Sequence, residues 1–178
     1  MKKIYIVALL TVTCLISAGL LLAAQMQDDI AAHKGCKFCG MDRGVYDFSR
    51  MLIEYEDGTQ TAFCSIRCAA VDLANNIDKT PKAIKVGDFN SKQLIDAEKA
   101  FWLAGGGKPG VMSKRGKWAF EKKEDAESFQ KINQGKIVDF EGAIKMAFED
   151  MHEDTKAIRE RRKLKRMQMM EKKPAAGH

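Results

Sequence analysis

Alternating apolar and polar residues predict a β-hairpin and a helix in the first half of the chain. Residues 50–56 and 59–63 alternate in this way on either side of an Asp-Gly turn pair. Ser65 is a favourable N-cap for a helix that ends near Asn75. The apolar run over residues 83–89 then predicts a further strand.

The second half of the chain repeats this order. Strands are expected at residues 99–104 and 117–120, a helix at 123–133 and a last strand at 136–140. The strand–strand–helix–strand order therefore occurs twice. This repetition predicts an α+β fold of two small, similar modules, residues 34–90 and 91–140, consistent with an ancient duplication.

A long helix is predicted to begin near Phe140. Its inward face is expected to consist of Ile144, Ala147, Phe148 and Met151 and to fade after Asp154. We therefore expect the folded body to cover residues 30–151 and a basic helical tail to cover residues 152–178.

Composition and charge limit the class of protein. The chain has 178 residues, of which 46% are hydrophobic and 30% charged, and this excludes a disordered, collagen-like or multi-span membrane protein. The formal net charge is +6, but residues 155–173 hold nine Lys or Arg and two Glu, so the rest of the chain sums to −1. Because the body is close to neutral, nucleic acid is not expected as a partner.

The N-terminal segment, residues 1–29, has the pattern of an export signal. Lys2 and Lys3 precede an uncharged run over residues 4–24, and acidic residues follow it. Three outcomes stay open: an uncleaved membrane anchor, a cleaved signal peptide, and lipidation at Cys14. Each would place the body on the periplasmic side of the inner membrane, anchored or secreted.

Four of the five cysteines form two close pairs. Cys36 and Cys39 lie on a loop before the predicted hairpin, whereas Cys64 and Cys68 lie at its end and in the first turn of the helix. A knuckle, a hairpin and a helix N-terminus can bring four thiolates together in the treble-clef manner, as a tetrahedral sulfur site. The helix N-terminus also favours thiolate over thiol.

Other interpretations of the cysteine pairs stay open. An exported protein readily forms two structural disulfides, and a pair of close cysteines can also exchange disulfides. Covalent haem attachment is excluded because the residue directly after Cys39 is not His. Metal binding is the interpretation that we favour.

Methionine residues bear on the choice of metal. Met41 follows Cys39 by two positions, and Met112 lies in the second module, whereas Met51 is expected in the core. Thiolate and thioether ligands select Cu(I) over hard ions. A set of three or fewer ligands would suit copper in transit, and four thiolates would hold a metal such as Zn permanently.

Several blocks of sequence resemble the NosL family, the accessory proteins of nitrous oxide reductase. They are Gly35-Cys-Lys-Phe-Cys-Gly-Met41, the Asp57-Gly58 turn, Leu94-Ile-Asp-Ala97, Gly110-Val-Met112, Trp118-Ala-Phe120 and Glu124-Asp-Ala-Glu-Ser-Phe129. The resemblance covers about residues 34–151. It implies an α+β fold of two modules, attachment to the membrane, and Cu(I) binding outside the cytoplasm for delivery to the reductase. It maps the Cys-Gly-Met motif onto Cys39, Gly40 and Met41, and the later Gly-x-Met onto Gly110 and Met112.

Two features depart from the family pattern. Residues 113–116 replace the usual glycine and acidic residue after the second methionine. The pair Cys64 and Cys68 is also additional to the general pattern, and it resembles the TRASH type of heavy-metal domain.

Three functions of different classes follow. The first is a membrane-associated Cu(I)-binding protein that delivers copper to a client enzyme. The second is a scaffold module with a structural Zn site that docks a partner, and the third is a thiol–disulfide oxidoreductase that serves a copper site. The first is preferred, and no enzymatic activity is expected because the sequence offers no Ser/His/Asp set and no phosphate loop.

The basic tail has three possible roles beyond a solvated helix. It could contact anionic lipid headgroups or an acidic patch on the client. Its thioethers, Met167, Met169 and Met170, together with His178, could also capture copper weakly.

Overall fold

The structure is a computed structural model that describes residues 28–171. Residues 1–27, with Cys14, and residues 172–178 lie outside the described part, so only Asp28 and Asp29 of the predicted export segment are described. The elements that lead to the end of the first sheet are α2 (Asp28–Ala32), β1 (Met51–Tyr55), β2 (Gln60–Phe63), α3 (Ile66–Asn75), β3 (Pro81–Gly87) and β4 (Leu94–Asp96). The elements that follow are β5 (Phe101–Ala104), β6 (Lys117–Phe120), α4 (Lys123–Asn133), β7 (Lys136–Val138) and α5 (Phe140–Glu171). β4 falls within residues 91–140, the predicted second module, but it pairs with β3.

The strands form two antiparallel sheets, and the α+β class expected from the sequence is confirmed. The first sheet has the order β2-β1-β3-β4 and the second the order β6-β5-β7. In the first sheet β1 lies between β2 and β3, and in the second sheet β5 lies between β6 and β7 in the same way. The two short elements α2 and β4 lack an alternating or periodic pattern and were not predicted.

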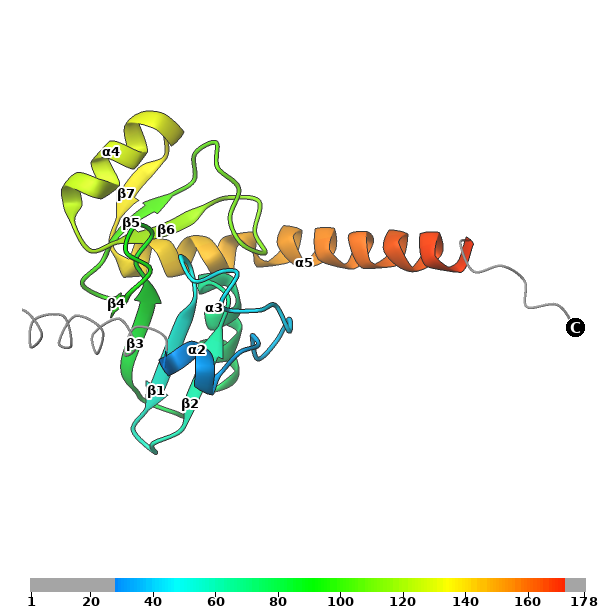
Figure 1. The fold of residues 1–178 in the computed structure, drawn as a ribbon, viewed down its shortest axis with the longest axis horizontal. Helices are drawn as coiled ribbons and strands as arrows, with labels where there is room; N and C mark the ends of the chain where they lie inside the picture. The colour runs from blue at the N-terminus through cyan, green and yellow to red at the C-terminus, as the bar shows by residue number, and fades with distance from the viewer. Residues whose placement is uncertain (1–27, 172–178) are drawn as a thin grey trace, which may run out of the picture.

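Helix α5 joins the two sheets. It crosses the middle of the molecule, packs against α3 and β5, and then extends well beyond the body (Figure 1). Trp102 of β5 lies against Phe140 at the start of α5, with ring centroids 6.1 Å apart, in a core that also contains Met51 and Phe63. Met51 is fully buried, as expected.

The contact face of α5 differs from the predicted one. Phe148 was expected on the inward face, but it is 44% exposed because it lies about 100° around the helix from the buried Ala147. The inward face also does not fade after Asp154, since both Asp154 and Ile158 are buried against the body. None of the helices within residues 28–171 is both long and apolar enough to span a membrane.

Candidate metal centre

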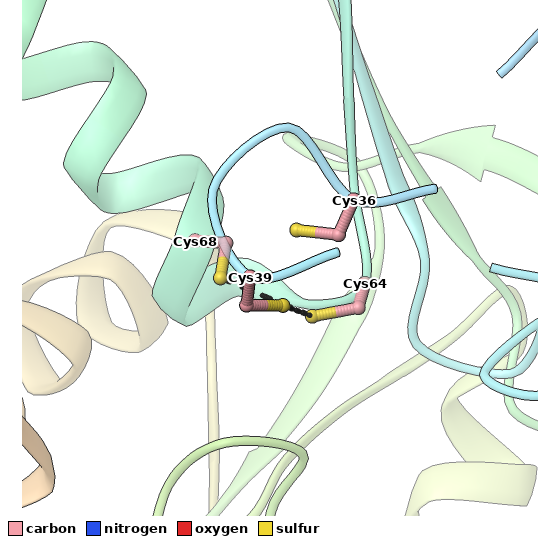
Figure 2. A group of neighbouring side chains, drawn as sticks. All are labelled: Cys36, Cys39, Cys64 and Cys68. Atoms are coloured by element: carbon pink, nitrogen blue, oxygen red, sulfur yellow. Dashed lines mark hydrogen bonds between the residues drawn. The ribbon is translucent and has the colours of Figure 1, made fainter. Parts of the chain in front are cut away.

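Four cysteine side chains converge at one point of the first module. The Sγ atoms of Cys36, Cys39, Cys64 and Cys68 all lie within 4.8 Å of one another. Figure 2 shows the first two on the loop before β1, the third at the end of β2 and the fourth in the first turn of α3, with their thiols directed toward one another. All four are free thiols in the structure.

The loop that carries Cys36 and Cys39 is a closed knuckle. The amide of Cys36 donates to the carbonyl of Met41, and the amide of Gly40 donates to the carbonyl of Cys36, both over 2.9 Å. Gly40 adopts a φ of +73°, a left-handed conformation that glycine takes without strain. The Cys-Gly-Met motif therefore requires glycine between its two sulfur residues for a conformational reason.

Lys37 attaches the knuckle to the sheet and to α3. Its amide donates to the carbonyl of Ala62, and its ammonium forms a 2.9 Å ion pair with Asp72. Asp72 is fully buried and also accepts hydrogen bonds from Tyr55 and Thr61. These bonds hold the pKa of Asp72 below its usual value although burial raises it. One buried carboxylate thus joins the knuckle, the hairpin and the cysteine-bearing helix.

A second buried network holds the other end of the knuckle. Arg43 is fully buried and donates to the carbonyls of Asp29, His33, Met51 and Phe63. The carboxylate of Asp29 pairs with Arg43 and also with the buried Arg50. Sequence reasoning missed both networks, because the residues of their ion pairs lie 14 to 35 positions apart and no local spacing reveals them.

The second cysteine pair begins α3. Ser65 occupies the N-cap position, as predicted, but its hydroxyl makes no capping bond. Instead it donates to the carbonyl of Val111 over 3.0 Å, and Ser49 donates to the carbonyl of Cys64 over 2.8 Å. The predicted N-cap residue therefore joins the cysteine site to the loop that carries Met112.

The thiols interact strongly with one another. Hydrogen bonds from Cys39, Cys64 and Cys68 hold the pKa of Cys36 far below its usual value. For Cys39, the bond with Cys36 raises the pKa. The bonds with Cys64 and Cys68 together lower it by a larger amount, so the pKa falls to about 7. The pKa values of Cys64 and Cys68 are raised by bonding to Cys36 and Cys39 and by burial. A metal that binds among these thiols would displace the protons that they still carry.

The sulfur spacing fits a single metal ion. A tetrahedral centre with metal–sulfur bonds of about 2.3 Å separates its ligands by about 3.8 Å. The Sγ atom of Cys64 lies 3.5 Å from that of Cys39 and 3.9 Å from that of Cys68. Little movement would be needed to place one ion among the four sulfurs.

The two predicted thioether ligands lie beside this group. Cys39 is half-buried, whereas the other three cysteines are buried, and it lines one surface hollow together with Met41 and Met112. Met112 has a φ of +61°, which is unusual for a residue other than glycine. The hollow is completed by Ile158, Arg161, Arg162 and Lys165 of α5, which the sequence assigned to a separate tail.

Comparison with known proteins identifies similar chains. A family model described as NosL matches residues 27–148. The crystal structure of the copper chaperone NosL from Shewanella denitrificans superposes with a TM-score of 0.50 and 24% sequence identity, over 61% of this chain and 88% of that one. At this identity the likeness shows a shared fold. No curated protein matches the sequence.

Proposed function

The chain belongs to the NosL family, and from that premise we propose that it binds Cu(I) outside the cytoplasm and delivers it to a copper enzyme. The observation that carries the proposal is the group of four cysteine sulfurs, which opens at Cys39 toward Met41 and Met112. Soft thiolate and thioether ligands select Cu(I). The relative from Shewanella denitrificans is described as a copper chaperone, and we extend this role to the present chain.

The arrangement of ligands suits a metal that is held and then released. Cys36, Cys64 and Cys68 are buried, so a metal bound among them is shielded from solvent. Cys39 is half-buried and lies in the same hollow as the two thioethers. Neutral thioethers bind more weakly than thiolates, so Met41 and Met112 would hold Cu(I) where an incoming ligand can replace them.

The location and the client are further parts of this proposal. The basic, apolar and acidic order of the N-terminal segment supports export to the periplasmic side of the inner membrane, with the chain anchored or released there. Family membership supports nitrous oxide reductase as the client. The protein would therefore act as a binding and transfer protein rather than as an enzyme.

A competition titration tests the copper site. The full chain, reduced and kept anaerobic in mild detergent, is titrated with Cu(I) against bathocuproine disulfonate. We expect Cys39→Ser to weaken binding about 100-fold, which corresponds to ~2.7 kcal/mol. Met112→Leu should weaken it about tenfold, or ~1.4 kcal/mol. Met51→Leu is the matched control, because it removes a buried thioether away from the hollow, and it should leave the affinity unchanged. Equal affinities for wild type and Cys39→Ser would refute the proposal.

The sulfur spacing also favours a second candidate, a structural zinc centre. Four thiolates about 3.8 Å apart are the closed arrangement of structural zinc sites, and such sites contribute to folding. The protein would then be a scaffold module. Recovery of one zinc per chain, with loss of the circular dichroism of the body after chelation, would establish this function. A metal-free chain that keeps its circular dichroism would support copper transfer instead.

A further inference from the structure

The candidate metal site opens to the surface beside three basic side chains of α5. Its hollow has a volume of about 230 Å³, and Arg161, Arg162 and Lys165 of α5 line it together with Cys39. Of the ion pairs formed within residues 28–171, none includes these three cations. Their charge is therefore available to a partner that approaches the metal site.

The charge is concentrated on this part of the molecule. Residues 156–166 hold seven Lys or Arg and one Glu, although the chain outside residues 155–173 sums to −1. The same helix is anchored to the body as far as Ile158, so its first basic turns lie beside the cysteines. Part of this positive charge therefore lies next to the place where a metal would leave.

A larger hollow adjoins this opening. Its volume is about 820 Å³, and it shares Met41, Met112 and Arg161 with the smaller one. Trp118 and Asp154 are among the residues that line it. The two hollows together offer space for a protein segment on both sides of the thioethers.

The end of α5 does not have the pattern of a membrane-surface helix. Such a helix needs a broad apolar face to enter the headgroup region. Beyond Ile158 the apolar residues are Leu164, Met167, Met169 and Met170, which are all exposed among basic neighbours on most sides of the helix. Charge directed toward an acidic protein surface explains this distribution better than an anionic bilayer does.

We propose that the surface around Cys39, Met41 and Met112, bordered by Arg161, Arg162 and Lys165, is a docking site for an acidic protein acceptor of Cu(I). Acidic groups on the acceptor are attracted by the basic border, which raises the rate of encounter and fixes its orientation. Its own sulfur or imidazole ligand then replaces the weakly bound thioethers. This inference rests on the proposed copper function and adds the kind of partner to it.

Copper transfer to two synthetic peptides tests this surface. Both peptides carry the same Cys-x-x-Cys site, flanked by Glu in one and by Gln in the other. At low salt the loaded full chain should transfer Cu(I) to the Glu peptide at least about tenfold faster than to the Gln peptide, and this difference should vanish near 1 M salt. A triple variant, R161E/R162E/K165E, should lose the preference while its Cu(I) affinity stays within about threefold of wild type.

A matched variant controls for net charge. K122E/K131E/K136E makes the same change in total charge at exposed positions on and beside α4, and it should transfer like wild type. Equal rates for the two peptides, or equal slowing in both triple variants, would overturn the proposal. So would a loss of binding to phosphatidylglycerol vesicles in R161E/R162E/K165E with unchanged transfer, because the surface would then contact lipid. So would a change in Cu(I) affinity large enough to explain the change in rate.

A copper-free measurement separates this inference from the proposed function. Binding of a fluorescent Glu peptide that lacks cysteines to the metal-free chain reports on the surface alone. If the chain binds no Cu(I) but binds this peptide and R161E/R162E/K165E does not, the copper function fails and the docking surface stands. If Cu(I) binds tightly and the metal-free chain has no preference for the Glu peptide over its Gln counterpart, the docking surface fails and the copper function stands.

Discussion

At the scale of single residues, the candidate site depends on buried charges as much as on sulfur. Arg43 follows the Cys-Gly-Met motif by two positions, and its side chain is satisfied entirely by main-chain carbonyls and Asp29. Removing one partner from such a pair leaves an uncompensated buried charge, which costs far more than the pair itself contributes. Asp29 is therefore the residue whose substitution should loosen the knuckle without touching a sulfur.

Asp29→Asn should lower the free energy of unfolding by about 3 kcal/mol at pH 7. Burial raises the pKa of Asp29, but its bonds to Arg50 and Arg43 lower it more, so its pKa in the folded state lies below the ordinary value. The carboxylate therefore stabilises the fold above about pH 4, and this contribution is lost as the pH falls through the folded pKa. Urea unfolding from pH 7 to pH 3 should show the difference between wild type and Asp29→Asn narrowing below about pH 4.

The control for this prediction is another paired aspartate. Asp57 lies on the exposed hairpin turn and forms an ion pair with Lys79. Asp57→Asn should therefore change the free energy of unfolding little at any of these pH values. A loss as large as that of Asp29→Asn would show that burial is not the cause. An Asp29→Asn chain as stable as wild type at pH 7 would remove the structural role of the network.

At the scale of elements, the sequence predicted the strands and the helix that carry the cysteines, because the signals for these elements are local. The hairpin turn, the N-cap position of Ser65 and the spacing of the two cysteine pairs together place four sulfurs on adjoining elements. The strand β4 could not be predicted, because its three residues are too few to show an alternating pattern and it is defined only by its pairing with β3. The hydroxyl of Ser65 was expected to cap α3, yet it binds the carbonyl of Val111, a contact over 46 residues that only the assembled fold provides.

The loop that carries Met112 is held by α5. Lys117 is almost fully buried and pairs with Asp150 over 2.7 Å, and Arg115 pairs with the same carboxylate. One helix residue thus holds the loop on which the second thioether lies. The amide of Lys114 adds a bond to Asp154.

Asp150→Asn should free this loop. The buried ammonium of Lys117 would lose its counter-charge, which should lower the free energy of unfolding by about 2–3 kcal/mol. Hydrogen–deuterium exchange should become at least about tenfold faster in peptides covering residues 105–116 and stay unchanged in α3. Glu149→Gln is the matched control, since Glu149 is exposed and its ion pair within residues 28–171 is with Arg115. Equal acceleration in both variants, or none in Asp150→Asn, would contradict this assignment.

At the scale of the whole molecule, the sequence separated a body from a basic tail, and the structure joins them. The division at residue 151 followed the fading of apolar residues along α5. Buried Asp154 is polar and Ile158 is isolated among charges, so neither continues a recognisable apolar stripe. Their burial depends on α3 and on the Met112 loop, which pack against this part of α5. For the same reason, the sequence could not place Arg161, Arg162 and Lys165 beside the metal site.

Two truncations locate the functional end of the body. A chain ending at Ile158 loses only residues that are exposed up to residue 171, so its free energy of unfolding should stay within about 0.5 kcal/mol of the full chain. A chain ending at Met151 also loses Ile158 and the partners of Arg67 and Lys114, namely Thr155 and Asp154. Burial of one isoleucine and the loss of a bond to a buried guanidinium together amount to about 3–5 kcal/mol. Urea unfolding of the three chains should therefore separate the shortest from the other two. The chain ending at Ile158 keeps the four cysteines, Met41 and Met112 but lacks the basic border. It should therefore bind Cu(I) as the full chain does and lose the preference for the Glu peptide. If the chain ending at Ile158 unfolds as readily as the chain ending at Met151, residues beyond 158 support the body, and the distinction between a packed helix and a projecting basic arm is wrong.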